Sequence, residues 1–456
     1  MNPLDTGRRF RLSAFRHAGA GLLTALGLLA AAPAAHAVPS FARQTGADCA
    51  ACHVGAFGPQ LTPYGIKFKL GGYTETDGKG GKVPLSAMIV GSYTQTRKDQ
   101  AERPTDTASV NKNLALDEAS LFLAGRLSDK IGAFIQATYD GVGRSTALDQ
   151  VDIRAAHTFD LAGKETIVGL SLNNNPGVQD PFNTMPVWGF PYTASPLAFG
   201  LGDAATMING GLEQRVAGLS AYAFWNNLVY AELGTYRTLS PTMQSKFGVG
   251  RADDPGKLGS SSAYWRLALF QDLKKQAFNV GVFGLNSSIT PRGETGSNRY
   301  NDVGVDASYQ FLGTRKHVAT VNTSFIRERQ TLNQLFDAGE ADNRKARLNE
   351  FKLSTSYHYD QTWGATIGRF LTTGTADATR YDFSSTGSPN SAGYILQADY
   401  TPWGKEASFG APWANLRLGA QYTMYTKFNG AKNDYDGTGR NAKDNNTLFL
   451  FAWTSF

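Results

Sequence analysis

The residues with the clearest chemical signature stand together as Cys49-Ala50-Ala51-Cys52-His53. Two cysteines three positions apart, followed directly by a histidine, form the attachment pattern of a c-type haem. The two thiols bond covalently to the porphyrin, and the histidine binds its iron. A disulfide, a redox-active cysteine pair and a zinc site share this spacing. The chain has only two cysteines, zinc would require ligands that are absent nearby, and a redox pair would require a βαβ setting. We therefore expect one covalent haem c at Cys49 and Cys52, with His53 as its axial ligand.

The sixth ligand of that iron is not evident, because no further histidine or methionine lies between residues 54 and 87. Alternation of polar residues around Met88 and His358 predicts that both point into a lumen, which makes them the two candidates. Three other side chains occupy the strand positions that carry apolar residues, so we expect them to face outward: His157, His317 and Met424. Two methionines lie in the longest loop, residues 173–212, which could fold inward: Met185 and Met207. A methionine in the lumen more often fills space than binds a metal, so five-coordinate iron is a further alternative.

The first 37 residues have the pattern of an export signal. Four arginines within the first 16 residues precede an apolar stretch from about 18 to 32, and Ala35-His36-Ala37 forms a small-residue cleavage site. The apolar stretch is short for a membrane span. We expect residues 1–37 to be removed and the mature chain to start at Val38, outside the cytoplasm, where bacteria attach c-type haem.

Composition narrows the class of protein. After the signal there is no long apolar run, which excludes a helical membrane protein. The 50 glycines, 19 tyrosines and 27 phenylalanines, with a mean hydropathy of -0.30, favour two-faced strands. The net charge of +6 is modest and shows no clustered basic stripe, so we exclude nucleic acid as a partner.

Residues 38–83 form a small haem module with a linker. Thr62-Pro63 is a typical helix start, and Gly71-Gly72 should end that helix after residues 64–70. About 45 residues cannot bury a sufficient core. The module therefore needs the haem, and another surface, to stay folded.

Beyond Pro84 the pattern has a period of two, as in residues 150–154 and 350–354. We predict sixteen strands of about ten residues. They begin near Leu85, Leu114, Lys130, Asp149, Glu165, Glu213, Leu228, Ala263, Ala277, Tyr300, Lys316, Leu348, Thr362, Tyr394, Asn415 and Thr447. Even-numbered connections are short and odd-numbered ones long, except the fourteenth, residues 402–414.

Short periplasmic turns, long outer loops and a last strand ending in Phe456 are typical of outer-membrane barrels. The predicted fold is all-β: residues 84–456 form a 16-stranded antiparallel transmembrane β-barrel, with the N-terminal cytochrome c module as its plug. Both chain ends should be periplasmic, with outer-membrane lipid around the wall. A soluble secreted β-protein is the alternative.

The haem motif and its surroundings resemble the fused monohaem cytochrome–porins of the outer membrane, a family that includes iron-oxidising proteins. The matching residues are Pro39-Ser40-Phe41-Ala42-Arg43-Gln44-Thr45-Gly46, Cys49-Ala50-Ala51-Cys52-His53, Pro59-Gln60-Leu61, Gly65, Phe68-Lys69 and Gly72-Tyr73. Over the barrel the likeness is architectural only, in strand number and loop parity.

The resemblance implies electron transfer across the outer membrane, from extracellular Fe(II) or another external donor to periplasmic c-type cytochromes. Iron oxidation would make the protein an Fe(II) oxidase. The alternative is a solute-conducting porin with a tethered cytochrome module. The chain shows no nucleophile–base set, phosphate loop or second metal motif, so no catalytic residue is assigned.

Overall fold

The computed structural model describes residues 38–456, apart from 81, 190, 251–255, 260–261 and 407, and begins with short helices. The predicted export signal lies outside the described residues. The helices are α2 (Pro39–Thr45), α3 (Cys49–Cys52), α4 (Pro63–Leu70), α5 (Pro241–Lys246) and α6 (Asn333–Asp337). Single helical turns occur at Val54–Ala56, Pro186–Trp188, Met207–Gly211 and Ala442–Asn445. No described helix has the length and apolar character needed to cross a membrane.

Local sequence explains the two helices around the haem motif. The α3 turn starts at Asp48, whose Oδ1 accepts a hydrogen bond from the Ala51 amide at 3.0 Å. Thr62 caps α4 by accepting from the Gly65 amide at 3.3 Å, and proline occupies the first helical position. The helix predicted at residues 64–70 is thus confirmed, with Gly71 at its C-terminal end.

Strands are the main regular elements of the rest of the chain. Before the long loop at residues 174–215 the strands are β1 (Leu85–Thr96), β2 (Asn113–Arg126), β3 (Ile131–Asp140), β4 (Ser145–Leu161) and β5 (Lys164–Asn173). Then follow β6 (Val216–Trp225), β7 (Val229–Thr238), the two-residue β8 (Lys257–Leu258), β9 (Ala263–Asp272), β10 (Gln276–Thr290) and β11 (Asn298–Phe311). The last are β12 (His317–Thr331), β13 (Lys345–Tyr359), β14 (Trp363–Gly374), β15 (Ser391–Tyr400), β16 (Asn415–Lys427) and β17 (Thr447–Ser455).

The long strands close into a barrel. Each pairs antiparallel with the long strands before and after it, and β17 pairs with β1 from Met88↔Ser455 to Thr96↔Thr447. Apart from the short β8, which adds to β10, the described strands number sixteen. The predicted 16-stranded antiparallel barrel is confirmed, and every predicted strand start lies within four residues of the observed one.

One detail of the connection pattern was wrong. The third connection, predicted to be long, spans only residues 141–144, because β4 begins at Ser145 rather than near Asp149. The Asp140 carboxylate makes this tight turn by accepting hydrogen bonds from the amides of Val142 at 2.8 Å and Gly143 at 2.9 Å. A side chain that turns its own backbone in this way replaces a longer loop.

The two faces of the wall differ in polarity. Side chains at alternate positions of β6, β12 and β13 are buried and exposed. Outward side chains are largely apolar, with Leu121 at 68% and Leu233 at 71% exposure. Many inward side chains are charged or polar, among them Glu232, Arg266 and Glu328. A closed barrel with an apolar outer wall and a polar interior has the organisation of a transmembrane barrel.

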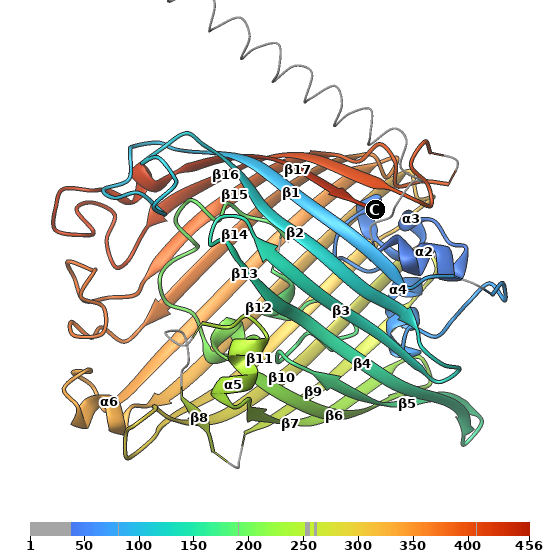
Figure 1. Cartoon of the computed structure of the whole chain (residues 1–456), viewed down its shortest axis with the longest axis horizontal. Coiled ribbons are helices and arrows are strands. Elements are labelled where there is room, and N and C mark those ends of the chain that lie inside the picture. The colour runs from blue at the N-terminus through green and yellow to red at the C-terminus, as the bar shows by residue number, and fades with distance from the viewer. Residues whose placement is uncertain (1–37, 81, 190, 251–255, 260–261, 407) are drawn as a thin grey trace, which may run out of the picture. The chain divides into compact units, whose positions relative to one another are not determined.

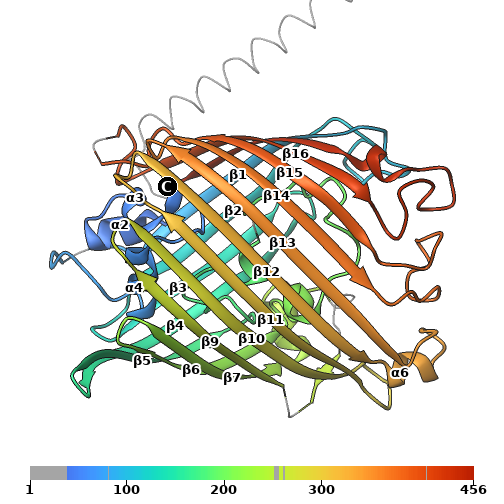
Figure 2. The same cartoon turned by 180° about the vertical axis from the view of Figure 1, so that it is seen from behind.

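One end of the barrel carries the N-terminal module, residues 38–83, together with the C terminus (Figures 1 and 2). The short even-numbered connections lie at this end. The fourteenth, between β15 and β16, is longer and covers α3: the Ala50 amide donates to the Gly404 carbonyl at 3.1 Å, and the Glu406 amide donates to Asp48 Oδ2 at 3.1 Å. Its length is therefore explained by contact with the haem motif.

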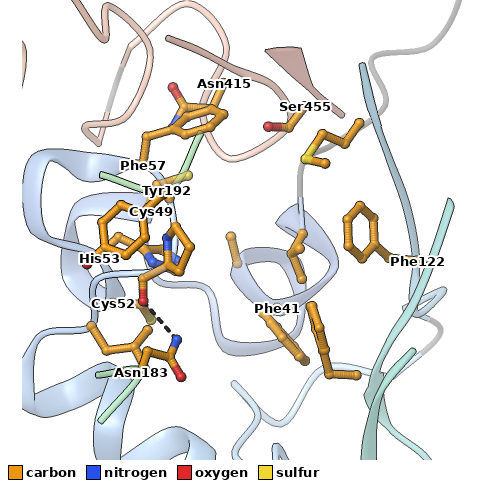
Figure 3. A pocket seen from close by; sticks show the side chains of 18 of the residues that line it. Phe41, Cys49, Cys52, His53, Phe57, Phe122, Asn183, Tyr192, Asn415 and Ser455 are labelled. Carbon is orange, nitrogen blue, oxygen red and sulfur yellow. Dashed lines mark hydrogen bonds between the residues drawn. The ribbon is translucent and has the colours of Figure 1, made fainter. Parts of the chain in front are cut away.

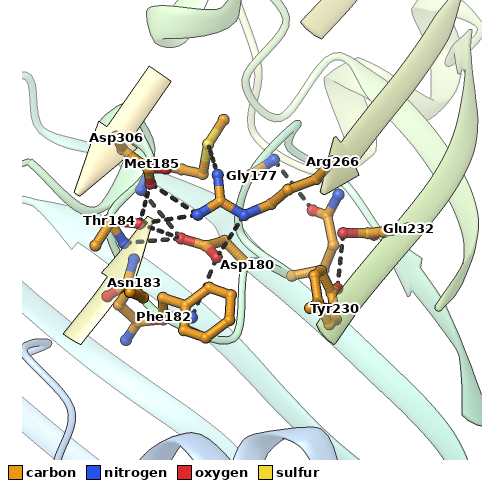
Figure 4. A network of polar contacts seen from close by, with 12 residues as sticks. Gly177, Asp180, Phe182, Asn183, Thr184, Met185, Tyr230, Glu232, Arg266 and Asp306 are labelled. Carbon is orange, nitrogen blue, oxygen red and sulfur yellow. Dashed lines mark hydrogen bonds and ion pairs between the residues drawn. The ribbon is translucent and has the colours of Figure 1, made fainter. Parts of the chain in front are cut away.

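The connection between β5 and β6, residues 174–215, folds into the lumen, and we call it the inward loop. Its Met185, Ile208 and Leu212 pack against inward residues of the wall. Figure 4 shows how charge fixes it: the Arg266 guanidinium lies 3.2 Å from Asp180 of the loop and 2.7 Å from Asp306 of β11. All three side chains are fully buried. The loop thus fills part of the lumen that the wall encloses.

Candidate haem site

The haem motif forms one tight turn at the mouth of the barrel. Cys49 and Cys52 begin and end α3, which places both on the same face of a single helical turn. The His53 amide donates to the Cys49 carbonyl at 2.9 Å, and the Thr62 amide donates to the Cys52 carbonyl at 2.9 Å. These bonds hold the three motif side chains together.

Both cysteines and His53 line a cavity of about 290 Å³ between the module and the barrel wall. Figure 3 shows the three motif side chains on one side of it and Phe122 of β2 on the other. Its remaining lining is largely aromatic and apolar: Phe41, Phe57, Phe68, Phe134, Trp188, Tyr192 and Trp453. The lining also has polar and charged members: Asp48, Lys69, Glu118, Gln136, Gln150, Asn183, Asn415 and Ser455. A mainly apolar cavity that also presents polar groups is typical of a cofactor site.

The module, the inward loop and several wall strands build this cavity. The module supplies the motif, the inward loop supplies Trp188 and Tyr192, and the wall supplies residues such as Phe122 of β2 and Trp453 of β17. Asn183 of the inward loop binds the module directly, because its amide nitrogen donates to the Pro59 carbonyl at 2.8 Å. The loop therefore forms a wall of the cavity and is also bonded to the module.

Burial governs the protonation of the motif. It raises the pKa of Cys49 to about 11 and that of Cys52 to about 12, so both thiols are neutral at pH 7. A redox-active cysteine pair has a lowered pKa instead. Burial, with repulsion from Arg417, lowers the pKa of His53 to about 4, so its imidazole is neutral, as an iron ligand must be.

The donor set fits a c-type haem. Both thiols open on the cavity and do not form a disulfide. The buried Nδ1 of His53 has no hydrogen-bond partner among the described residues. When bound there, a haem would supply a one-electron centre held by Cys49, Cys52 and His53. Within the described part of the chain, no group of three or more histidine, cysteine or acidic side chains is arranged to hold a metal ion.

The structure separates the two candidates for the sixth ligand. Met88 of β1 is inward and lines the cavity. His358 of β13 is inward and 6% exposed, but it packs against the motif turn from outside the cavity. A Cβ on Gly55 would stand 2.5 Å from His358 Cε1, which shows how closely the ring covers that turn. Only Met88 thus shares the cavity with His53.

The other sulfur and imidazole groups lie away from the cavity. His157 and His317 are exposed on the outer wall, and Met424 is half-buried there, as their strand parity predicts. Met185 and Met207 do lie in the inward-folded loop. The Arg266 guanidinium donates to Met185 Sδ at 3.3 Å.

Sequence reasoning missed most of the cavity wall. Trp188, Tyr192 and Asn183 lie in a loop with no periodic pattern, and Phe122 and Trp453 read as ordinary strand residues. It also missed the wall side chains that hold the module. Six of them donate hydrogen bonds to module carbonyls: Arg154, Tyr222, Gln310, Arg315, Asn415 and Arg417. For the donors that lie within strands, the one available sequence signal was their alternation with apolar residues, which places them on the inner face of the wall.

The chain matches no protein-family model and no curated protein. It is similar to the structure of a loop L8 deletion mutant of OmpT, an outer membrane protein of Vibrio cholerae, with a TM-score of 0.43 and 8% identity over 82% of this chain and 97% of that one. The anion-selective porin from Comamonas acidovorans aligns with a TM-score of 0.43 and 12% identity, over 81% and 98% of the two chains. For the outer membrane channel DcaP of Acinetobacter baumannii the TM-score is 0.43 and the identity 10%, over 82% and 96%.

The described residues of the chain form a sixteen-stranded antiparallel barrel. Membership of the cytochrome–porin family remains a prediction from residues 39–73.

Proposed function

We propose that this protein transfers electrons across the bacterial outer membrane, with one covalent haem c held at Cys49, Cys52 and His53. The observation that carries the proposal is the cavity, in which two neutral thiols and a neutral imidazole face an aromatic wall at one mouth of the barrel. A porin needs no such cavity, and a soluble cytochrome needs no barrel. The combination is what a membrane-spanning electron carrier requires.

The chain's own residues perform three tasks in this proposal. Cys49, Cys52 and His53 hold the cofactor, and aromatic side chains around the cavity exclude water from it. The wall donors to the module carbonyls fix the module in the barrel. The barrel provides the passage through the lipid that separates an external donor from periplasmic c-type cytochromes. Fe(II) is the leading donor, on the strength of the family resemblance.

The direct test uses the purified, haem-loaded and oxidised full chain. Anaerobic addition of Fe(II) should reduce the haem, measured as the change in its absorbance bands. A variant with both cysteines replaced by alanine, which cannot retain haem covalently, serves as the control. If another external reductant reduces the haem and Fe(II) does not at any pH, the electron-carrier proposal stands and iron as the donor is wrong. No reduction by any donor would overturn the proposal.

Solute conduction is the second candidate, and the size of the barrel favours it, because sixteen strands enclose a water-filled channel unless something fills it. Here the module and the inward loop both occupy the interior. Liposomes containing the full chain should therefore swell slowly in sugar solutions. Swelling at the rate of an open porin would support conduction as the main function.

The proposed membrane topology can be tested with inserted epitopes. Gly163, in a short connection, and Gly339, in a long one, are suitable insertion sites because a Cβ at either would meet no atom within 4 Å. On intact cells an antibody should reach the epitope at Gly339 and not the one at Gly163. The opposite result would reverse the orientation of the barrel.

A further inference from the structure

Arg417 of β16 is a buried charge beside the haem motif. Its side chain points inward and is 4% exposed. Its Nη2 donates to the Phe57 carbonyl at 3.1 Å, and its guanidinium carbon lies 5.4 Å from the centre of the Phe57 ring. A Cβ on Gly58 would stand 3.3 Å from its Nη1. Phe57 and Gly58 line the same cavity as His53, so the guanidinium lies directly behind that wall of the cavity.

The charge of Arg417 lies close to the motif turn. The Phe57 carbonyl that it binds comes four residues after His53 in the chain, and His53 and Phe57 line the same cavity. Its ion-pair partner Asp399 lies 3.3 Å from Nε and is buried as well. The guanidinium contacts the cavity wall at Phe57, whereas Asp399 is not among the residues that line the cavity, so the positive charge is the nearer of the two to the cavity.

We propose that Arg417 is a positioning residue that raises the reduction potential of the haem iron bound by His53. The proposal rests on the proposed haem function. Adding one electron to ferric iron gives ferrous iron and removes one positive charge, with no proton transferred. A fixed positive charge in a buried site disfavours the ferric form more than the ferrous form, because low polarity strengthens the repulsion. Arg417 therefore stabilises the reduced protein.

Arg315 provides a matched comparison within the same molecule. It also donates to a module carbonyl, with Nη1 at 2.9 Å from Ala50 O. Unlike Arg417 it is exposed at the mouth of the barrel. Water and salt screen an exposed charge, so Arg315 should influence the iron far less.

The test is a spectroelectrochemical titration of the haem-loaded full chain in detergent. Arg417→Gln should make reduction about tenfold less favourable, a decrease of about 59 mV for one electron. Arg417→Lys keeps the charge and should retain most of the potential. Arg315→Gln should change it by much less. An unchanged potential in Arg417→Gln, or equal decreases in Arg417→Gln and Arg417→Lys, would overturn the proposal.

Asp399→Asn keeps the test decisive if Arg417→Gln does not fold. It removes the compensating negative charge while preserving shape, so the potential should rise. An unchanged or lowered potential would contradict the role of Arg417. Failure of the proposed haem function is a separate result, because the wild-type chain would then carry no covalent haem to titrate.

Discussion

The N-terminal module meets the barrel through two contrasting surfaces. Toward β1, β2 and β17 it leaves the aromatic cavity, bordered by Phe122 and Trp453. On that side α2 also bonds β1 and β2, through Ser86 and Arg126. Toward the other strands close polar contacts predominate, in which wall side chains donate to the backbone carbonyls of the module. Tyr222 binds the Leu70 carbonyl at 2.6 Å, and Gln310 binds the Leu61 carbonyl at 2.7 Å.

The contrast separates the surface that holds the module from the surface proposed to hold a cofactor. Buried backbone carbonyls need donors, and the wall supplies them on one surface. On the other surface the protein leaves space unfilled, although protein interiors are normally close-packed. Space next to two neutral thiols and a neutral imidazole is what a prosthetic group would occupy. Substitutions on the two surfaces should therefore have different effects.

The largest effect is expected on the cavity surface. Replacing both Cys49 and Cys52 with alanine should abolish covalent haem, because the only two thiols of the chain are removed. Haem staining after denaturing electrophoresis measures this, since thioether bonds survive denaturation. Loss of stain together with normal barrel assembly would show that the barrel assembles without covalent haem. Covalent haem retained in the double variant would refute the assignment of the motif.

The next effect concerns the polar surface, where Arg154 is fully buried. It pairs with Asp152 at 2.8 Å and donates to the Lys69 carbonyl at 3.2 Å. Arg154→Gln leaves a buried carboxylate without its cation, which costs about 3–5 kcal/mol. Protease cleavage within α4, which is largely buried while the module is docked, should therefore accelerate in the native protein by about 100-fold or more.

Arg344→Gln is the matched control for that variant. Its ion pair with Asp337 has side chains 48% and 63% exposed, and an exposed pair contributes about 0–1 kcal/mol. Equal cleavage rates in the two variants would show that the polar surface does not hold the module.

A smaller effect is expected where α4 touches the haem motif. A Cβ on Gly65 would stand 2.4 Å from the Cys52 carbonyl oxygen, so Gly65→Ala must push the helix and the motif apart. Overpacking of this kind costs about 1–3 kcal/mol. The yield of covalent haem per barrel should fall. Gly80→Ala, with nothing within 4 Å of its Cβ, should leave the yield unchanged.

The smallest effect is a pH dependence at Lys69, whose ammonium donates to the Val178 carbonyl at 2.8 Å and to Asn183 at 2.7 Å. Burial, with repulsion from Arg154, lowers the pKa of Lys69 to about 7, from 10.5 when free. Between these values the undocked module binds more protons than the docked one. Docking should therefore strengthen by on the order of 1–2 kcal/mol from pH 7 to 9, and stay constant below pH 7.

Cleavage within α4, normalised to that of an unfolded peptide at each pH, measures this dependence. Lys69→Met removes the titrating group and should make the pH profile flat. Docking that weakens as the pH rises in the wild-type protein would contradict the lowered pKa.

Sequence predicted the regular parts of this molecule well, for physical reasons. Alternation and turn residues are local, so strand starts such as Leu85 and Thr447 were found at the observed residues. Thr62 and Pro63 likewise mark the start of α4. Met88 was placed in the lumen by parity alone, and it lines the cavity.

The contacts that assemble the site were beyond local reasoning. Arg417 and Trp453 are separated from the motif by more than 350 positions and meet it only because the barrel closes. Tyr192 lies in a loop whose path depends on buried ion pairs such as Arg266 with Asp180. His358 has the right parity and lies at the right end, yet it packs behind Gly55 rather than in the cavity.

The cavity is lined both by Val38, at the start of the described chain, and by Ser455, next to its last residue. It is therefore incomplete until β17 has paired with β1. Closing the barrel and completing the cavity are the same structural step. A chain that lacks β17 would keep Cys49, Cys52 and His53 but would lose Trp453 and Ser455 from the cavity lining.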